Sequence, residues 1–91
     1  MSRRRVVVTG MGMLTPLGNT VAETWAAILA GRSGIGPIET FDVTAYATQF
    51  GGGLKGFDVE QYIPQRDARR MDPFIQYGMA AGIQAFEDAA I

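Results

Sequence analysis

The sequence predicts an α/β fold, and three of its segments carry that prediction. Residues 6–8 are three consecutive valines that lead into the glycine-rich residues 9–12. Such a β-branched run is typical of a strand buried on both faces inside a parallel sheet. Residues 20–30 show one apolar stripe at helical spacing, and residues 73–90 are apolar around most of a helix. A buried strand with helices to cover it indicates a layered α/β arrangement.

The composition narrows the classes of function that the chain can support. The 91 residues allow at most one small domain, with 47% hydrophobic residues, 19% charged residues and a net charge of −1. This balance argues against a nucleic-acid-binding protein. The sequence holds neither cysteine nor histidine. These absences remove a disulfide framework, most metal sites, every Cys or Ser/His nucleophilic pair, and the commonest general base from these residues.

The start of the chain does not read as a targeting segment. Residues 1–5 are basic, but the apolar run that follows is only three valines long. A secretory signal needs an apolar core of about 7–15 residues. No run approaches the roughly 18 apolar residues that suggest a membrane span. We therefore expect a soluble, cytoplasmic protein without a membrane or nucleic-acid partner.

A helix is predicted over residues 20–30. Thr20 and Glu23 fit a capping box, in which a hydroxyl and a carboxylate satisfy free backbone donors at the helix start. Gly31 is well placed to end the helix. The apolar stripe consists of Val21, Trp25, Ile28 and Leu29. Trp25 could serve as a ligand platform, but its place on this stripe favours a core position.

Residues 31–57 differ in composition from both flanks. They hold seven of the twelve glycines, together with Pro37. Residues 35–38 surround that proline and predict an edge strand at best, and residues 48–54 predict a second strand that contains three consecutive glycines. The segment is too short for a domain, so we interpret it as a hairpin-like surface insertion.

A short charged helix is predicted over residues 64–71, with Pro64 in its first turn. Arg66, Arg69 and Arg70 are spaced i, i+3 and i+4, which places them on one face of that helix. The spacing alone fits a solvated surface face. It also fits a small basic patch for an acidic partner or a phosphate.

The strongest helix prediction begins at Asp72, a good N-cap, and Pro73, a good first helical residue, and runs to about Ala90. One side carries a large apolar row and the neighbouring side carries a row of small residues. The large row is Ile75, Met79, Ile83, Phe86 and Ala90, and the small row is Gly78, Ala81, Gly82, Ala85 and Ala89. This pattern predicts a buried helix whose small row lets another backbone pack closely.

The chain supplies too little protein to cover these elements. A strand such as residues 6–8 needs parallel neighbours, and a helix that is apolar on most sides needs covering layers. We therefore expect residues 1–91 to be an N-terminal segment, an incomplete domain, of a larger protein.

The Gly10-Met11-Gly12 sequence also raises the possibility of a dinucleotide site. The third glycine of that fingerprint would fall at Thr15, and the helix starts only near Thr20 instead of directly after the glycines. No P-loop motif is present either. The glycine pair therefore does not indicate a nucleotide-binding loop.

Four segments resemble a known enzyme family in order and spacing. They are VVVTGMGMLTPLGN (6–19), ETWAAILAGRSGI (23–35), FDVTAYATQFGG (41–52) and RRMDPFIQYGMAAG (69–82). Together they resemble the start of a β-ketoacyl-acyl-carrier-protein synthase, closest to the type II elongation synthase of bacterial fatty-acid synthesis. The resemblance implies the N-terminal part of a thiolase-like layered α/β fold.

The resemblance also implies a reaction, the decarboxylative Claisen condensation of an acyl thioester with malonyl-carrier protein in fatty-acid elongation. The chemistry needs a cysteine thiolate, two histidines and backbone N–H donors for an oxyanion. No catalytic residue is assigned, because the sequence has neither cysteine nor histidine. These residues alone are expected to be inactive. The resemblance implies no cofactor, and it implies a homodimer.

One site follows from the same resemblance. Arg66, Arg69 and Arg70 fall at positions where the family docks its acidic carrier protein, which favours the docking interpretation over a solvated face. Two other functions stay open. The chain could belong to an aromatic-polyketide ketosynthase or to the inactive chain-length partner of one. It could also be a non-catalytic module that binds a carrier protein.

Overall fold

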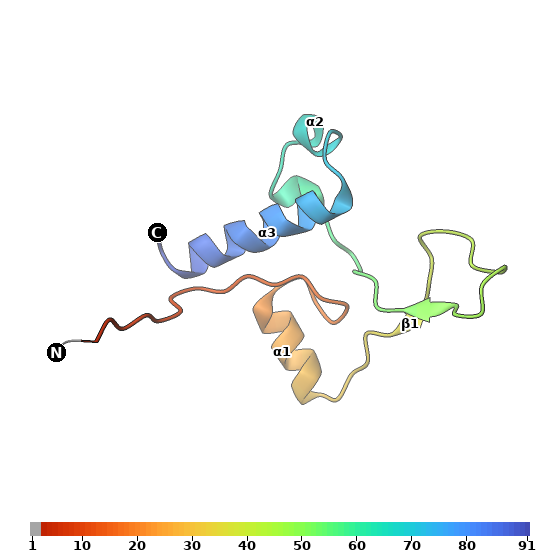
Figure 1. The fold of residues 1–91 in the computed structure, drawn as a ribbon, viewed down its shortest axis with the longest axis horizontal. Helices are drawn as coiled ribbons and strands as arrows, with labels where there is room; N and C mark the ends of the chain where they lie inside the picture. The colour runs from red at the N-terminus through yellow and green to blue at the C-terminus, as the bar shows by residue number, and fades with distance from the viewer. Residues whose placement is uncertain (1–2) are drawn as a thin grey trace.

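The computed structural model describes residues 3–91, so Met1 and Ser2 of the basic start lie outside the described residues. The molecule is elongated, with extents of 61 × 37 × 25 Å (Figure 1). Its elements, in chain order, are α1 (Val21–Leu29), β1 (Gly36–Pro37), β2 (Phe50–Gly51), η1 (Val59–Gln61), α2 (Gln65–Ala68) and α3 (Pro73–Asp88). Helices therefore predominate in this part of the chain.

Helix α1 confirms the predicted helix and its caps. The side chain of N-cap Thr20 accepts a hydrogen bond from the Glu23 N–H at 3.1 Å. The Glu23 carboxylate accepts from the Asn19 N–H at 2.8 Å, one residue earlier than the predicted capping box has it. At the other end, Gly31 has a φ of 71° and its N–H donates to the Ile28 carbonyl. Glycine adopts this left-handed conformation without steric cost, so it ends the helix as predicted.

The predicted core position of Trp25 is wrong. Trp25 is 58% exposed, and the buried residues of α1 are Thr24 and Ala27 on another flank. That flank contacts the preceding turn, where the hydroxyls of Thr15 and Thr24 lie 2.8 Å apart. The rest of the apolar stripe is left mostly uncovered, since Ile28 and Leu29 are 50% and 69% exposed.

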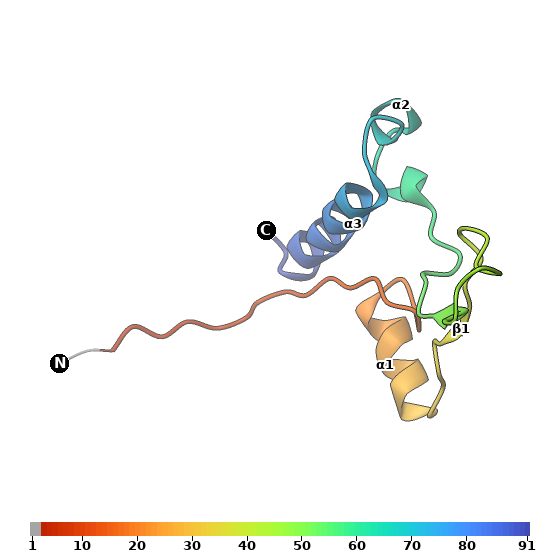
Figure 2. The same cartoon turned by 45° about the vertical axis from the view of Figure 1, so that its right-hand side comes forward.

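The predicted strand at residues 6–8 is also not formed. The three valines are 67–87% exposed and belong to no strand among residues 3–91. Figure 2 shows the N-terminal stretch running away from the helices. A strand requires a neighbouring strand to bind its backbone groups, and none of the described segments lies beside this one.

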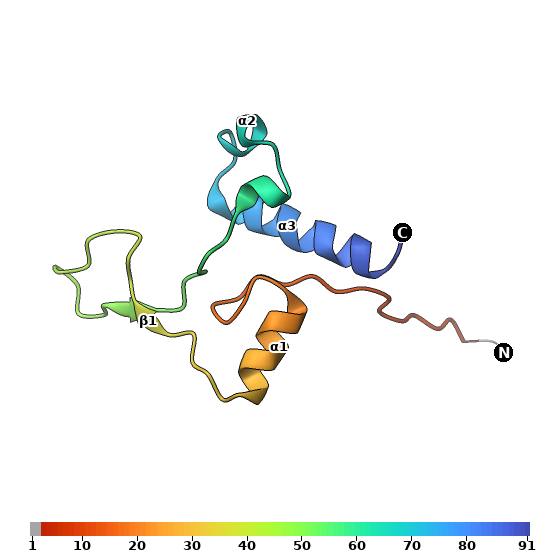
Figure 3. The same ribbon diagram turned by 180° about the vertical axis from the view of Figure 1, so that it is seen from behind.

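Part of the small-residue row of α3, at Ala81, Ala85 and Ala89, receives another backbone as predicted, whereas an added Cβ at Gly78 or Gly82 would meet nothing within 4 Å. Residues 10–13 run along α3, seen from the front in Figure 1 and from behind in Figure 3. A Cβ atom added to Gly12 would overlap the Ala81 carbonyl oxygen, and one added to Gly10 would overlap Ala85 and Ala89. The glycine pair is thus explained by close packing of an extended backbone against a helix.

Helix α3 begins as predicted, with Asp72 at the N-cap and Pro73 at the first position, although the Asp72 side chain makes no capping hydrogen bond. It ends at Asp88, two residues before the predicted end. As expected for a chain that supplies too little protein to cover it, this apolar helix stays largely exposed. Only Ala80 is buried, and Phe86 is 62% exposed. Residues 10–13 and the η1–α2 region cover part of the helix and leave the rest open.

The hairpin-like insertion is confirmed, with shorter strands than predicted. β1 and β2 pair antiparallel, with Gly36 opposite Gly51 and Pro37 opposite Phe50. Pro37 has no N–H to donate, and the glycines at 51–53 provide no side chains to pack, which fits strands of only two residues. One further backbone bond, from the Ile38 N–H to the Gln49 carbonyl at 3.0 Å, continues the pairing. In Figure 3 the hairpin projects from the body of the molecule.

Candidate functional site

The three predicted site residues lie on one short turn. Residues 64–71 join η1 to α3 and are called here the arginine turn. Pro64 is the N-cap of α2, and its carbonyl accepts from the N–H groups of Asp67 and Ala68. A proline at this position sacrifices no helical donor. The helix is only four residues long, yet helical hydrogen bonding continues beyond it, from Arg70 N–H to the Asp67 carbonyl at 3.1 Å.

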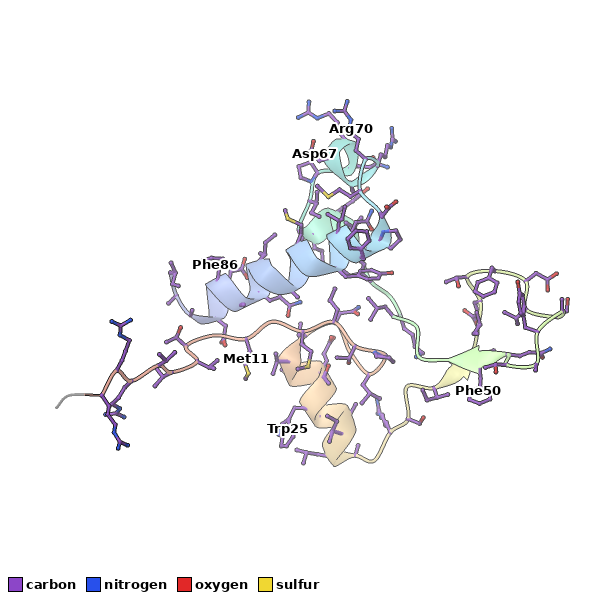
Figure 4. All side chains as sticks on the ribbon, viewed as in Figure 1. Met11, Trp25, Phe50, Asp67, Arg70 and Phe86 are labelled. Carbon is purple, nitrogen blue, oxygen red and sulfur yellow. The ribbon has the colours of Figure 1, made fainter. Side chains whose placement is uncertain are left out.

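The three arginines follow one another closely along this turn. Arg66 lies in α2, Arg69 is its C-cap and Arg70 follows directly. All three are exposed. Figure 4 shows nitrogen-tipped side chains gathered at the outer end of α2, with Arg70 among them.

The charges of the arginine turn are weakly paired. Arg66 Nε lies 3.9 Å from Asp67 Oδ1, and this is the only salt bridge among residues 3–91. The Arg66 side chain is 86% exposed, so the pair contributes little stability in water. Arg69 and Arg70 form no salt bridge within the described chain. Their charges are therefore available to an anionic partner.

Apolar packing anchors the turn on its inner side. Ile63 and Ala68 are two of the four buried apolar residues among residues 3–91. Next to them the rings of Phe57 and Tyr62 stack at 6.2 Å, and Phe57 meets Tyr77 of α3 edge-on at 5.3 Å. The exposed arginines thus lie on a turn whose inner side is anchored by packed side chains, and not on a free loop.

An open depression of about 370 Å³ borders the turn. Arg70 and Asp67 lie on its polar side, and Ile63, Met71 and Met79 contribute apolar surface. Within residues 3–91, no group of histidine, cysteine, aspartate or glutamate residues is arranged to hold a metal ion. None of the helices described here is long and apolar enough to span a membrane.

Two polar residues that the sequence patterns did not single out link distant segments. Lys55 Nζ donates to the carbonyls of Pro16 at 3.1 Å and Gly34 at 2.9 Å, which fastens the base of the hairpin to the N-terminal turn. Gln84 accepts from the Met13 N–H at 3.0 Å and donates to the Asn19 carbonyl at 2.7 Å. No local signal could have found them, because their partners lie 21–71 residues away.

Comparison with known proteins gives consistent matches over the whole chain. Residues 3–91 match the family model described as "Beta-ketoacyl synthase, N-terminal domain". The chain is 65% identical to 3-oxoacyl-(acyl-carrier-protein) synthase 2 of Vibrio cholerae serotype O1 over all 91 residues, and 59% identical to the synthase 2 of Vibrio harveyi. It spans 22% of the length of each of these relatives.

A solved structure shows the same fold. The structure titled "The ishigamide ketosynthase/chain length factor" matches 99% of this chain with a TM-score of 0.86 and 34% identity, and the chain spans 22% of it. The expected thiolase-like α/β fold is thereby confirmed. Given this fold and the match over residues 3–91, the chain belongs to the β-ketoacyl synthase family.

Proposed function

We propose that this chain is the N-terminal segment of a longer condensing enzyme that extends fatty acids. The observation that carries the proposal is the 65% identity to a 3-oxoacyl-(acyl-carrier-protein) synthase 2, maintained over all 91 residues. Because the chain spans 22% of that relative, the remaining parts of the reaction centre are expected outside these residues.

The proposed reaction forms one carbon–carbon bond. A cysteine thiolate first carries the acyl chain as a thioester. Malonyl-carrier protein then loses CO₂, and the resulting carbanion attacks the thioester carbonyl, which breaks the carbon–sulfur bond and releases the thiolate. Since the 91 residues contain neither cysteine nor histidine, the nucleophile and the groups that stabilise the enolate and oxyanion are assigned to the rest of the enzyme.

The arginine turn is the proposed contribution of this segment to substrate delivery. Arg66, Arg69 and Arg70 are exposed, lie on one turn and stand on a packed base. Such a cluster suits an acidic carrier protein. Exposed charges speed the encounter of the two proteins and fix the orientation of the carrier, while they add only modest affinity. The carrier protein is therefore the proposed partner. A cytoplasmic homodimer is the proposed state of the whole enzyme.

A second candidate function has one observation in its favour. The matching solved structure is a ketosynthase/chain length factor, at 34% identity. A polyketide ketosynthase, or a chain-length partner without the nucleophile, would use the same fold. The higher identity to the 3-oxoacyl-(acyl-carrier-protein) synthase 2 of Vibrio cholerae favours the fatty-acid enzyme.

Intact mass followed by thiol labelling tests the proposal. We expect purified protein to have a mass several times the 9.8 kDa of this chain, to carry one alkylation-sensitive cysteine and to decarboxylate malonyl-carrier protein. A mass of 9.8 kDa would support a non-catalytic carrier-binding module instead. A longer protein with no reactive cysteine would point to a chain-length partner.

A further inference from the structure

Gln76, in the first turn of α3, bonds to the backbone just before and just after Arg69 and Arg70 of the arginine turn. Its Nε2 donates to the Ala68 carbonyl at 3.0 Å and to the Met71 carbonyl at 3.4 Å. Ala68 and Met71 directly flank Arg69 and Arg70 in the sequence. A side-chain amide has two N–H donors, so one glutamine can serve both carbonyls.

These carbonyls belong to a short segment whose own backbone hydrogen bonds span at most four residues. Helix α2 has four residues, and isolated helical turns of this length are unstable in water. Its last carbonyl, that of Ala68, accepts the Met71 N–H at 3.1 Å and keeps a second lone pair for Gln76. The buried Ala68 fixes one point of the turn, and the Gln76 bonds fix the chain before and after the arginine pair. Gln76 is itself partly buried, which strengthens its hydrogen bonds relative to exposed ones.

We infer that Gln76 is a positioning residue for the carrier-protein interface. It holds Arg69 and Arg70 in the orientation in which they meet the partner, without contacting the partner itself. The inference rests on the proposed docking function of the arginine turn. Its physical basis is preorganisation: a binding group that is already ordered loses less conformational freedom on association. The arginines provide the charge of this surface, and Gln76 keeps the backbone that carries them ordered.

The test uses Gln76→Met in the full-length enzyme, because methionine has a similar length but no donor. Kinetics are compared for malonyl-carrier protein and for malonyl-pantetheine, which lacks the carrier. We expect KM for the carrier substrate to rise about three- to tenfold. This range corresponds to losing the net free-energy contribution of about one hydrogen bond. The turnover number and all parameters with malonyl-pantetheine should stay unchanged. The salt dependence should also persist, because both arginines remain.

Gln84→Met is the matched control. It removes an amide from the same helix. That amide bonds to Met13, Asn19 and Tyr62, none of which lies within residues 64–71. It should lower stability without a selective rise of the carrier KM. Gln76→Glu, which keeps the size but cannot donate when ionised, gives a second variant if Gln76→Met does not fold.

The outcomes separate the inference from the proposed function. If Arg69→Glu/Arg70→Glu raises the carrier KM and neither Gln76 variant does, the positioning role is overturned and the docking surface stands. A loss of activity that is equal with both substrates would show a merely structural residue and would equally overturn the inference. If the arginine reversal itself has no effect on the carrier, the docking function fails, and the inference fails with it.

Discussion

The backbone N–H of Met13 donates a 3.0 Å hydrogen bond to Oε1 of Gln84, a residue 71 positions later in the chain. Two residues earlier, the N–H of Met11 donates to Asp88 Oδ2 at 3.0 Å, four residues further along α3. Two residues of extended chain advance by about 6.6 Å, and four residues of helix advance by about 6 Å. The spacing of the two N–H donors therefore matches the spacing of their two acceptors on α3. The helix side chains thereby take the place of a neighbouring strand for residues 11–13.

Close packing of Gly12 on α3 gives the first prediction. Gly12→Ala should lower the free energy of unfolding by about 1–3 kcal/mol, because the added Cβ meets the backbone carbonyl of Ala81, which cannot move without distorting the helix. Urea denaturation of the purified protein measures the change. Gly53→Ala is the matched control, since nothing lies within 4 Å of its added Cβ. Equal stability of the two variants would contradict the packing role.

The Gln84 amide joins three segments, which gives the second prediction. Gln84→Met leaves the Met13 N–H, the Asn19 carbonyl and the Tyr62 hydroxyl without this partner. We expect a loss of about 1–3 kcal/mol in the free energy of unfolding. Gln61→Met, at an exposed position, should change it by less than about 0.5 kcal/mol. If both substitutions had the same small effect, the network would have no net stabilising role.

Two helix ends with the same backbone geometry but different residues give the third prediction. Gly31 after α1 has a φ of 71°, and Ala90 after α3 has a φ of 59°. Gly31→Ala should cost about 1 kcal/mol through backbone strain alone, since its added Cβ meets open space. Ala90→Gly should gain about 0.5–1 kcal/mol, because glycine removes that strain. Thermal unfolding of the two variants should shift in opposite directions, and a shared direction would refute the assignment.

Charge reversal of the arginine turn gives the fourth prediction. Arg69→Glu/Arg70→Glu in the full-length enzyme should slow turnover with the carrier-bound substrate and flatten its dependence on ionic strength, because the steering charges are inverted. Steady-state kinetics between low and physiological salt measure both effects. Arg32→Glu, an exposed arginine just beyond α1, is the control. An unchanged salt response in the double variant would exclude this surface as the docking site.

Asp42 in the hairpin gives the fifth prediction. The Thr44 N–H donates to Asp42 Oδ1 at 3.0 Å, and this bond, aided by the Thr44 hydroxyl, lowers the pKa of Asp42 from its ordinary value of 3.8. A lowered pKa means that the ionised Asp42 carboxylate stabilises the turn at pH values above its ordinary pKa. This stabilisation is lost as the pH falls through the lowered pKa. The Thr44 amide resonance should therefore titrate with a midpoint below 3.8. Asp42→Asn should abolish that titration.

The local sequence determined the helices and their ends. Thr20, Gly31 and Pro73 each act within about four residues of the helix terminus, so their effect is already present in the order of residues. The glycines and Pro37 of the hairpin likewise restrict the strands through their own backbones. The helical spacing of the arginines predicted their shared exposed turn, and the family resemblance followed from motifs in the printed order.

The tertiary structure decided burial, pairing and the support of the arginine turn. Residues 6–8 and Trp25 carry strong strand and core patterns, yet both are exposed, because the surfaces that would cover them are not among the described residues. The roles of Gln76 and Gln84 depend on carbonyls and N–H groups that approach only when α3 packs against other segments. A cap needs only its own helix end, whereas a buried face, a strand and a bridging amide each need a partner brought in from elsewhere in the chain.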